Sequence, residues 1–347
     1  MTKKALLGKT LTELKEIAKE LDFPVFTARQ IADWLYKKNI RSIEEMTNLS
    51  KNAREKLNLK YEIGLIDSTK VQVSVDGTKK YLFPSVHPGK FIEAAFIPDE
   101  ERNTLCVSSQ VGCKMGCLFC MTGKQGFQGQ LSTREIVNQI RNLPERDSLT
   151  NIVFMGMGEP LDNILEVMKT LEILTADYGM GMSPKRITVS TIGILPGMRE
   201  FLDGSKCHLA ISLHSPFDEE RRKLMPIQNV FPLEKVLEMI RNFDFGRQRR
   251  VSFEYIMFKG INDTPRHVKE LCKILNGIKC RINLIRFHPI PNTPLEGSDD
   301  ATIEYFKNLL NKRGITTTLR RSRGLDIFAA CGLLSTKQLV QKQQKDY

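Results

Sequence analysis

The chain has 347 residues, long enough to bury one substantial core and to carry a small second unit. Its net charge of +12 and pI near 9.3 indicate a polyanionic partner, because clustered lysines and arginines gain affinity by displacing the counterions of phosphates. It contains no uninterrupted run of about 18 apolar residues, and its first residues hold too short an apolar run for a signal peptide. We therefore expect a cytoplasmic protein with no membrane partner.

The first 60 residues predict three short helices, each preceded by a residue whose side chain can cap the first turn. The capping residues and the helices that follow them are Thr10 with 11–21, Thr27 with 28–37 and Ser50 with 51–57. Lysines and arginines give this segment a basic face, which fits RNA contact and equally fits the solvated surface of a small helical bundle. We expect residues 1–60 to form a helical accessory domain.

A β segment is predicted for residues 61–100. Residues 70–75 alternate between polar and apolar side chains, Asp76-Gly77 favours a tight turn, and residues 78–83 can form the returning strand. This pattern is a strong signal for a β-hairpin. A third strand is expected at 91–97. We expect this segment to link the helical domain to a catalytic one.

From residue 101 to 335, apolar strands alternate with helical patterns. The expected strands are 105–108, 152–155, 187–190, 208–213, 251–256 and 282–287, and the helices between them include 133–142, 163–175, 233–243 and 264–275. Repeated strand–helix units predict an α/β fold whose parallel sheet curls into a full or partial barrel. In such a barrel the active site lies at the carboxyl ends of the strands. Residues 336–347 read as a polar tail.

Three of the eight cysteines fall within eight residues, at Cys113, Cys117 and Cys120. Cysteine thiolates hold four-iron clusters, and three of them leave one iron free for chemistry. Gly112 and Gly116 suit the tight turns that would aim these side chains at one centre. A structural zinc site with Cys106 as fourth ligand is the alternative, although no second pair of closely spaced cysteines is present.

These cysteines, followed by the strand end FMGMGEP at 154–160, resemble a radical S-adenosylmethionine (SAM) enzyme. The resemblance narrows to the RlmN/Cfr family of RNA adenine methyltransferases, and it runs from about Thr10 to Gly332. The stretches that carry it are LCVSSQVGC at 105–113, FMGMGEP at 154–160, STIG at 190–193, ISLH at 211–214 and AACG at 329–332. It implies a partial (βα)6 TIM-like radical SAM barrel, with a small helical accessory domain at the N-terminus that contacts RNA and a β-hairpin linker segment. Pro160 resembles the residue of the carbon-2 (RlmN) branch of the family, whereas the other branch often has alanine at this position.

The resemblance implies one [4Fe-4S] cluster, bound by the three clustered cysteines, and SAM, with two molecules used per turnover. It assigns the SAM contacts to Gly158, Glu159, Ser190, Ser212, Leu213, His214 and His288. His288 stands where the family often has asparagine, and Phe328 stands where it often has an acidic residue.

Carbon 2 of adenine is electron-poor, so it cannot attack the methyl group of SAM as an ordinary nucleophile would. The resemblance implies a radical route in which Cys331 first takes a methyl group from one SAM. A 5′-deoxyadenosyl radical from a second SAM removes hydrogen from that methyl, and the carbon joins the base. Glu93 is then implied as proton acceptor, and Cys106 as the thiol that resolves the adduct through a disulfide. Without the resemblance, Glu93 reads as an exposed strand residue and Cys106 as a buried strand cysteine.

The implied substrates are adenosine-2503 of 23S rRNA and adenosine-37 of tRNAs, with an electron donor protein such as flavodoxin or ferredoxin. A basic cluster before Cys331 could hold RNA phosphates, and it comprises Lys312, Arg313, Arg320, Arg321 and Arg323. Two alternatives stay open. One is methylation of carbon 8 of the same adenosine, and the other is a zinc-bound, non-catalytic RNA-binding protein, which metal analysis would separate from the enzyme.

Overall fold

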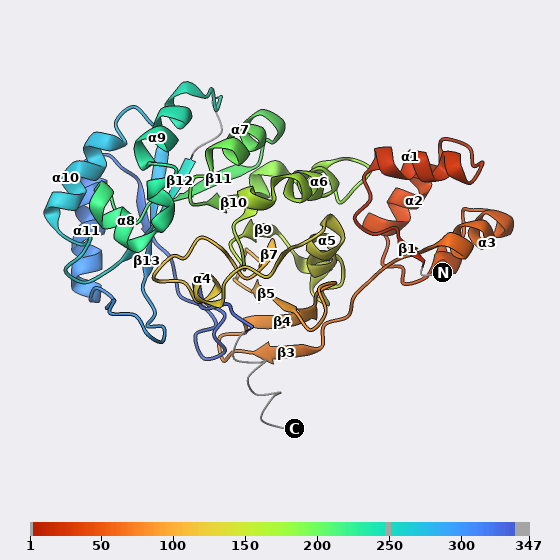
Figure 1. Ribbon diagram of the computed structural model, residues 1–347, viewed down its shortest axis with the longest axis horizontal. Helices are drawn as coiled ribbons and strands as arrows, with labels where there is room; N and C mark the ends of the chain where they lie inside the picture. Colours follow the sequence, from red (N-terminus) through yellow and green to blue (C-terminus); the bar gives the residue numbers. More distant parts are fainter. Residues whose placement is uncertain (1–2, 247–250, 337–347) are drawn as a thin grey trace.

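A ten-stranded sheet forms the centre of the computed structural model, which describes residues 3–246 and 251–336 (Figure 1). The order of strands across the sheet is β14-β13-β12-β11-β10-β9-β6-β5-β4-β3. The strands span β3 (Lys70–Val73), β4 (Lys79–Pro84), β5 (Phe91–Ile97), β6 (Thr104–Cys106), β9 (Asn151–Phe154), β10 (Ile187–Thr191), β11 (His208–Ser212), β12 (Val251–Met257), β13 (Cys280–Arg286) and β14 (Thr317–Leu319).

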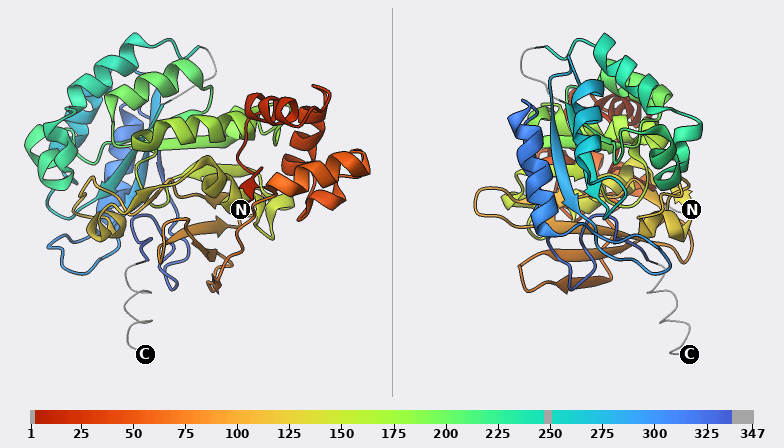
Figure 2. Two further views of the ribbon diagram at one scale, coloured as in Figure 1. Left: turned by 45° about the vertical axis from the view of Figure 1, so that its right-hand side comes forward. Right: turned by 90° about the vertical axis from the view of Figure 1, so that its left-hand side faces the viewer.

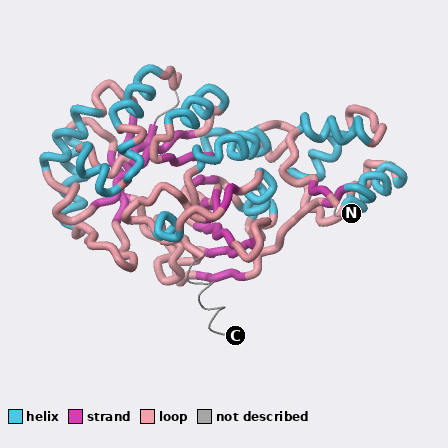
Figure 3. The backbone as a smooth tube through the Cα atoms, viewed as in Figure 1, coloured by secondary structure: helices cyan, strands magenta, loops and turns pink. Residues whose placement is uncertain are grey.

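Seven strands of this sheet, β6 and then β9 to β14, run parallel and neighbour one another in chain order. Helices follow these strands and surround the sheet on its outer side (Figures 2 and 3). They are α5 (Thr133–Arg141), α6 (Ile164–Thr175), α7 (Leu195–Gly204), α8 (Asp218–Leu224), α9 (Leu233–Asn242), α10 (Pro265–Ile274) and α11 (Asp300–Lys312). The predicted α/β fold with a partial barrel is therefore confirmed, and β14 adds one parallel strand that the sequence did not indicate.

The predicted hairpin and third strand form β3, β4 and β5, which pair antiparallel with one another and with β6. They extend the central sheet, whereas the sequence suggested only a link between two domains. In the described part of the chain the two edge strands, β3 and β14, do not pair, so the barrel stays open along one side.

Short elements complete the connections. The strands among them are β1 (Lys4–Ala5), β2 (Tyr61–Glu62), β7 (Gln110–Val111) and β8 (Gly129–Gln130), and the helix α4 spans Met121–Gln125. Single turns of 3-10 helix lie at Ile43–Glu45, Arg146–Ser148, Pro160–Asn163, Pro184–Arg186 and Pro226–Asn229.

The N-terminal segment is helical, as predicted, with α1 (Leu11–Glu20), α2 (Thr27–Tyr36) and α3 (Lys51–Lys60). Thr10 and Ser50 cap α1 and α3, and the Ser50 hydroxyl accepts the Ala53 amide at 3.1 Å. The prediction that Thr27 caps the second helix is wrong. Thr27 is the first residue of α2, and the preceding Phe26 makes no side-chain capping hydrogen bond.

This helical segment packs directly on the larger part of the protein, because its buried side chains form one cluster with Val137, Ile173 and Tyr178. The Arg141 guanidinium, at the end of α5, donates to the carbonyl oxygen of Leu35 at 2.7 Å.

The division into domains at residues 60, 100 and 335 stays a prediction. The polar tail lies outside the described residues except for Thr336. No helix in the described ranges is long and apolar enough to cross a membrane.

We predict that Arg141→Met lowers the free energy of unfolding by about 3 kcal/mol, because it leaves the carbonyl oxygens of Leu35 in α2 and of Ile40 after it without this donor. Arg29→Ala is the matched control, since Arg29 joins the same two parts through an exposed ion pair with Asp177 and should cost less than about 1 kcal/mol. Urea unfolding measures both. Equal losses in the two variants would contradict the importance of the Arg141 contacts.

Candidate active site

Two adjoining cavities lie on the inner side of the curled sheet. The thiol cavity, of about 150 Å³, is lined by Cys113, Cys117 and Cys120. The arginine cavity, of about 340 Å³, is lined by Arg102, Arg281, Arg320, Arg321 and Arg323. The two cavities share six lining residues, which are Met155, Glu254, Ile285, Arg320, Cys331 and Leu334.

The backbone around the three thiols requires glycine. Gly112 has a φ of +71°, and a Cβ there would lie 1.7 Å from the carbonyl oxygen of Gly126. Burial raises the pKa of the Cys113 thiol to about 12 and raises that of Cys117 well above its ordinary value, and the neighbouring thiols add to both shifts. Cys113 and Cys117 therefore need a cationic centre in their cavity before they can ionise together near neutral pH.

The three clustered thiols line one cavity, while the fourth ligand of the zinc alternative lies elsewhere. Among the residues that the structure describes, no group of three or more His, Cys, Asp or Glu side chains could hold a metal ion. In a four-iron cluster each thiolate binds a different iron, so the sulfurs stay further apart than around zinc. Cys106, the fourth ligand of the zinc alternative, lines the arginine cavity and not the thiol cavity.

Most of the residues that the resemblance assigns to SAM line the thiol cavity, namely Gly158, Glu159, Ser190, Ser212 and His214. Leu213 is buried but lines neither cavity, and His288 lines the arginine cavity, where its Nε2 lies 2.8 Å from the Ser322 hydroxyl. The structure thus brings five of the seven residues together.

Glu159 and His214 are each fixed by backbone hydrogen bonds. The Glu159 carboxylate accepts the amides of Leu161 and Ile192 at 3.1 and 3.0 Å, and burial raises its pKa to about 7. His214 Nδ1 accepts the Ile256 amide at 3.0 Å, and burial lowers the imidazole pKa to about 3. His214 is therefore neutral, with its proton on Nε2.

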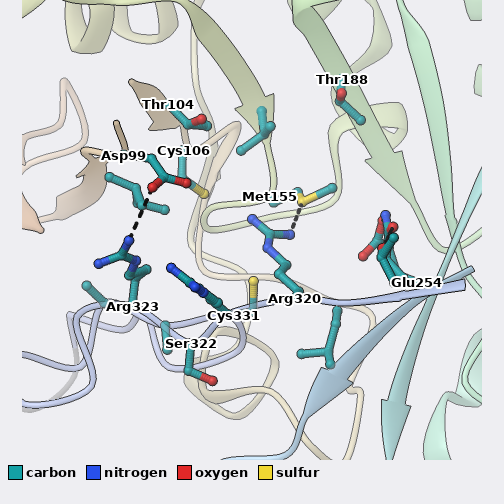
Figure 4. Close-up of a pocket in the computed structure, with 18 of the residues that line it drawn as sticks. Asp99, Thr104, Cys106, Met155, Thr188, Glu254, Arg320, Ser322, Arg323 and Cys331 are labelled. Carbon is teal, nitrogen blue, oxygen red and sulfur yellow. Dashed lines mark hydrogen bonds and ion pairs between the residues drawn. The ribbon is translucent and has the colours of Figure 1, made fainter. Parts of the chain in front are cut away.

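Cys331 lies on the loop that follows β14, and it faces both cavities. Figure 4 shows Arg320 beside Cys331 and reaching toward Met155, whose sulfur accepts a hydrogen bond from Arg320 Nη1 at 3.1 Å. The charge of Cys331, more than those of Glu254 and Cys106, raises the pKa of Arg320. None of the eight cysteines, all of which lie in the described ranges, forms a disulfide in this structure.

The loop that carries Cys331 is attached to the turn of the β3–β4 hairpin. The Asp326 carboxylate accepts the Ser74 hydroxyl at 2.5 Å and the Val75 amide at 3.1 Å, and the hydrogen bond from Ser74 lowers its pKa. Asp76 accepts the Gly324 amide at 2.9 Å. The loop therefore crosses the open side of the barrel, from β14 to the opposite edge of the sheet.

The chain after Cys331 is held by the segment that follows the three thiols. The Met121 amide donates to the Gly332 carbonyl oxygen at 2.8 Å, and the Thr122 hydroxyl donates to that of Leu334 at 2.6 Å. These bonds bring Cys331 to the thiol cavity, as the resemblance requires.

Glu93 is placed differently from the expectation of an exposed strand residue. It is only 1% exposed, and its carboxylate binds Lys80 Nζ at 3.0 Å and the Ser335 amide at 2.9 Å. Burial raises its pKa, as expected for an apolar strand. Glu93 lines neither cavity, and it connects to the loop that carries Cys331 through the Ser335 amide and through Lys80, whose Nζ donates to the Phe328 carbonyl oxygen at 3.5 Å.

Two residues of the shared wall have roles that the sequence did not indicate. Arg320 was expected only to hold RNA phosphates, and the structure also places it beside Cys331. Glu254 was not singled out at all, although a glutamate inside the otherwise apolar strand 251–257 was a signal that could have identified it.

The two parts of the chain match two family models. Residues 107–273 match the radical SAM superfamily, and residues 4–63 match the N-terminal domain of the ribosomal RNA large subunit methyltransferase. The first match contains the three thiols, and the second covers the N-terminal helical segment.

Relatives match over nearly the whole chain. A probable dual-specificity RNA methyltransferase RlmN of Parabacteroides distasonis is 57% identical over 97% of this chain and 98% of its own length. A dual-specificity RNA methyltransferase RlmN of Syntrophus aciditrophicus is 43% identical over 96% and 97%. The crystal structure of a radical SAM methyltransferase from Sphaerobacter thermophilus superposes with a TM-score of 0.89, at 37% identity over 95% of this chain and 99% of that one.

We predict that Asp326→Ala speeds alkylation of Cys331 by a small thiol reagent at least about tenfold, because two charge-assisted hydrogen bonds that hold the loop are lost. Peptide mass mapping gives the rate. Asp300→Ala, which removes an exposed ion pair with Arg286 away from this loop, should leave it unchanged. An unchanged rate in Asp326→Ala would show that the hairpin contacts do not position Cys331.

Burial, with an additional contribution from Cys331, raises the pKa of Cys106 to about 12, so this thiol is protonated near neutral pH. In a Cys331→Ala background, the rate at which Cys106 reacts with a thiol reagent should therefore rise about tenfold per pH unit between about pH 7 and 9. A plateau inside that range would contradict the raised pKa.

Proposed function

Because the chain belongs to the RlmN family of the radical SAM superfamily, we propose that it methylates carbon 2 of adenosine in RNA through a methylated cysteine. The single observation that carries this proposal is the position of Cys331, which faces the three thiols in one cavity and Cys106 in the other. A cysteine that is first methylated and later joined to the base needs access to both a SAM site and an RNA site.

The proposed substrates are adenosine-2503 of 23S rRNA and adenosine-37 of tRNAs. The relatives named above carry the description dual-specificity, and the five arginines of the arginine cavity provide the charge that RNA phosphates require. The name RlmN of these relatives favours carbon 2 over carbon 8. We place the protein in the cytoplasm, where both RNAs and a flavodoxin or ferredoxin electron donor are available.

We assign Cys113, Cys117 and Cys120 as the ligands of one [4Fe-4S] cluster. When bound, this cluster would supply the electron that cleaves SAM into methionine and a 5′-deoxyadenosyl radical. Gly158, Glu159, Ser190, Ser212 and His214 line the space beside the thiols and would hold SAM there. A Cβ on Gly158 would lie 2.4 Å from the Gln110 Cβ, so glycine is required here for this strand end to pack against Gln110.

Cys331 has two tasks in this proposal. Its thiolate first attacks the methyl carbon of one SAM, and S-adenosylhomocysteine leaves with the electrons of the broken bond. A second SAM then serves the radical step, in which its 5′-deoxyadenosyl radical removes a hydrogen atom from the methyl group on sulfur and the same carbon bonds to carbon 2 of the adenine. The surplus electron of the resulting ring radical would return to the oxidised cluster when carbon 2 loses its proton. The two tasks fit a side chain on the wall that both cavities share.

Cys106 and Glu93 are assigned to product release. The Cys106 thiolate attacks the Cys331 sulfur, and the new sulfur–sulfur bond replaces the bond from sulfur to the transferred carbon. That carbon keeps the electron pair and takes up a proton from solvent, which makes it a methyl group. Glu93 accepts the proton that carbon 2 loses. Since its carboxylate now binds Lys80 and the Ser335 amide, proton transfer requires the loop near Ser335 to move or a water to connect them.

The direct test is mass spectrometry of RNA after incubation with the reduced, cluster-loaded protein and SAM. The expected product is 2-methyladenosine. The 8-methyl isomer would support the alternative reaction, and the absence of any methylated adenosine would contradict the proposal. Cys331→Ala should lose all methylation and keep its iron and sulfide, whereas loss of iron in that variant would assign Cys331 to the cluster.

Cys106→Ala should accumulate a covalent adduct between protein and RNA, because the carbon can bond to the base but cannot be released from Cys331. The adduct is measured as RNA that stays with the protein in denaturing gel electrophoresis. Cys207→Ala is the matched control, since Cys207 is a buried cysteine that lines neither cavity, and it should trap no RNA. Free, fully methylated RNA from Cys106→Ala would remove Cys106 from this role.

A further inference from the structure

Glu254 is a buried acidic residue that the proposed chemistry does not use. It lies in the middle of β12, is 4% exposed and lines both cavities. In the register of the sheet it stands between Ser212 on β11 and Asn283 on β13. Figure 4 shows it across the arginine cavity from Cys106, with Arg320 between them.

The two oxygens of this carboxylate have different surroundings. Oε1 accepts a hydrogen bond from Asn283 Nδ2 at 2.8 Å, and Asn283 is itself held by the Thr318 hydroxyl at 2.9 Å. Oε2 is buried and has no hydrogen-bond partner among the groups that the structure describes. A buried carboxylate oxygen without a donor costs free energy, so its retention beside a cavity indicates a donor on a ligand.

The groups around Glu254 connect it to the arginine cavity. Asn283, which fixes the orientation of the carboxylate, lines the arginine cavity and not the thiol cavity. Burial raises the pKa of Glu254, and two arginines oppose this shift. One of them, Arg281, also lines only the arginine cavity. The other cation, Arg320, lies beside Cys331, to which the target base must bond. A base bonded to Cys331 from the arginine cavity therefore lies against the wall that contains Glu254.

We propose that Glu254 Oε2 accepts a hydrogen bond from the exocyclic amine of the target adenine and thereby selects adenine for methylation. The amine is the donor that adenine offers on its base-pairing edge, whereas guanine and hypoxanthine present a carbonyl oxygen at the same position, which a carboxylate repels. This inference rests on the proposed function, and it adds the group that recognises the base.

The experiment compares three RNA stem-loops that differ at the target position, with adenosine, purine riboside (no amine) or inosine (a carbonyl). The full chain with its cluster is used, and kcat/KM for methylation is measured for the wild type and for Glu254→Gln. Because purine lacks the electron-donating amine, its carbon 2 is no less reactive toward addition than that of adenine. A lower kcat/KM for the purine RNA therefore reports weaker recognition of the base. Thr188→Val is the control, because Thr188 lines the same cavity on another strand.

The wild type should use the adenosine RNA at least about tenfold better than the purine RNA. Glu254→Gln should reduce that ratio to near one and should improve inosine relative to adenosine, because an amide nitrogen can donate to a carbonyl. Thr188→Val should keep the wild-type ratio. SAM affinity, measured by equilibrium dialysis without reductant, should be the same in wild type and Glu254→Gln.

Equal use of adenosine and purine RNA by the wild type would overturn the inference, as would an unchanged ratio in Glu254→Gln. A loss of SAM affinity of about tenfold with an unchanged ratio would assign Oε2 to a hydroxyl of SAM instead. If the wild type methylates none of the three RNAs, the proposed function fails and the inference fails with it. If the wild type methylates RNA but Glu254→Gln keeps the wild-type preference for adenosine, the inference is overturned and the proposed function stands.

Discussion

The position of Cys331 depends on how its loop crosses the open side of the barrel. The sheet does not close, because β3 and β14 remain unpaired edges, and the loop after β14 covers that gap. The Asp326 carboxylate fixes one end of the loop to the β3–β4 turn, and the Gly332 carbonyl oxygen fixes the other end to the segment that carries the three thiols. One sulfur is thereby held between two cavities, and the opening of the barrel becomes the place where they meet.

The charges around this sulfur follow from burial. Burial raises the pKa of the thiols at Cys106 and Cys113, so these sulfurs are protonated until a cation or a base acts on them. Arginines line one cavity, and a metal cluster is expected in the other. In the proposed function, separate cavities keep the RNA and SAM apart, and the two cavities share a wall that contains Cys331, Arg320 and Glu254.

Local patterns were enough to predict most of the parallel sheet, since its strands are short apolar runs that alternate with amphipathic helices. The three clustered cysteines could also be identified as one candidate site, because they lie within eight residues of the sequence. Residues whose meaning depends on distant partners could not be assigned. Asp326 meets Ser74 across 252 positions of sequence, and the burial of Glu93 depends on Lys80 and on the loop near Ser335. The sequence likewise did not indicate that β3, β4 and β5 continue the central sheet, because an isolated hairpin has the same pattern.

The central claim is that Cys331 faces Cys106 while its loop stays attached to the thiol segment. It is tested most directly by oxidising the cluster-loaded protein with diamide and identifying the disulfides by peptide mass mapping, since cluster formation keeps Cys113, Cys117 and Cys120 unavailable. The account predicts one disulfide, between Cys106 and Cys331. A free Cys331 after complete oxidation, or its pairing with Cys207, Cys272 or Cys280, would contradict it.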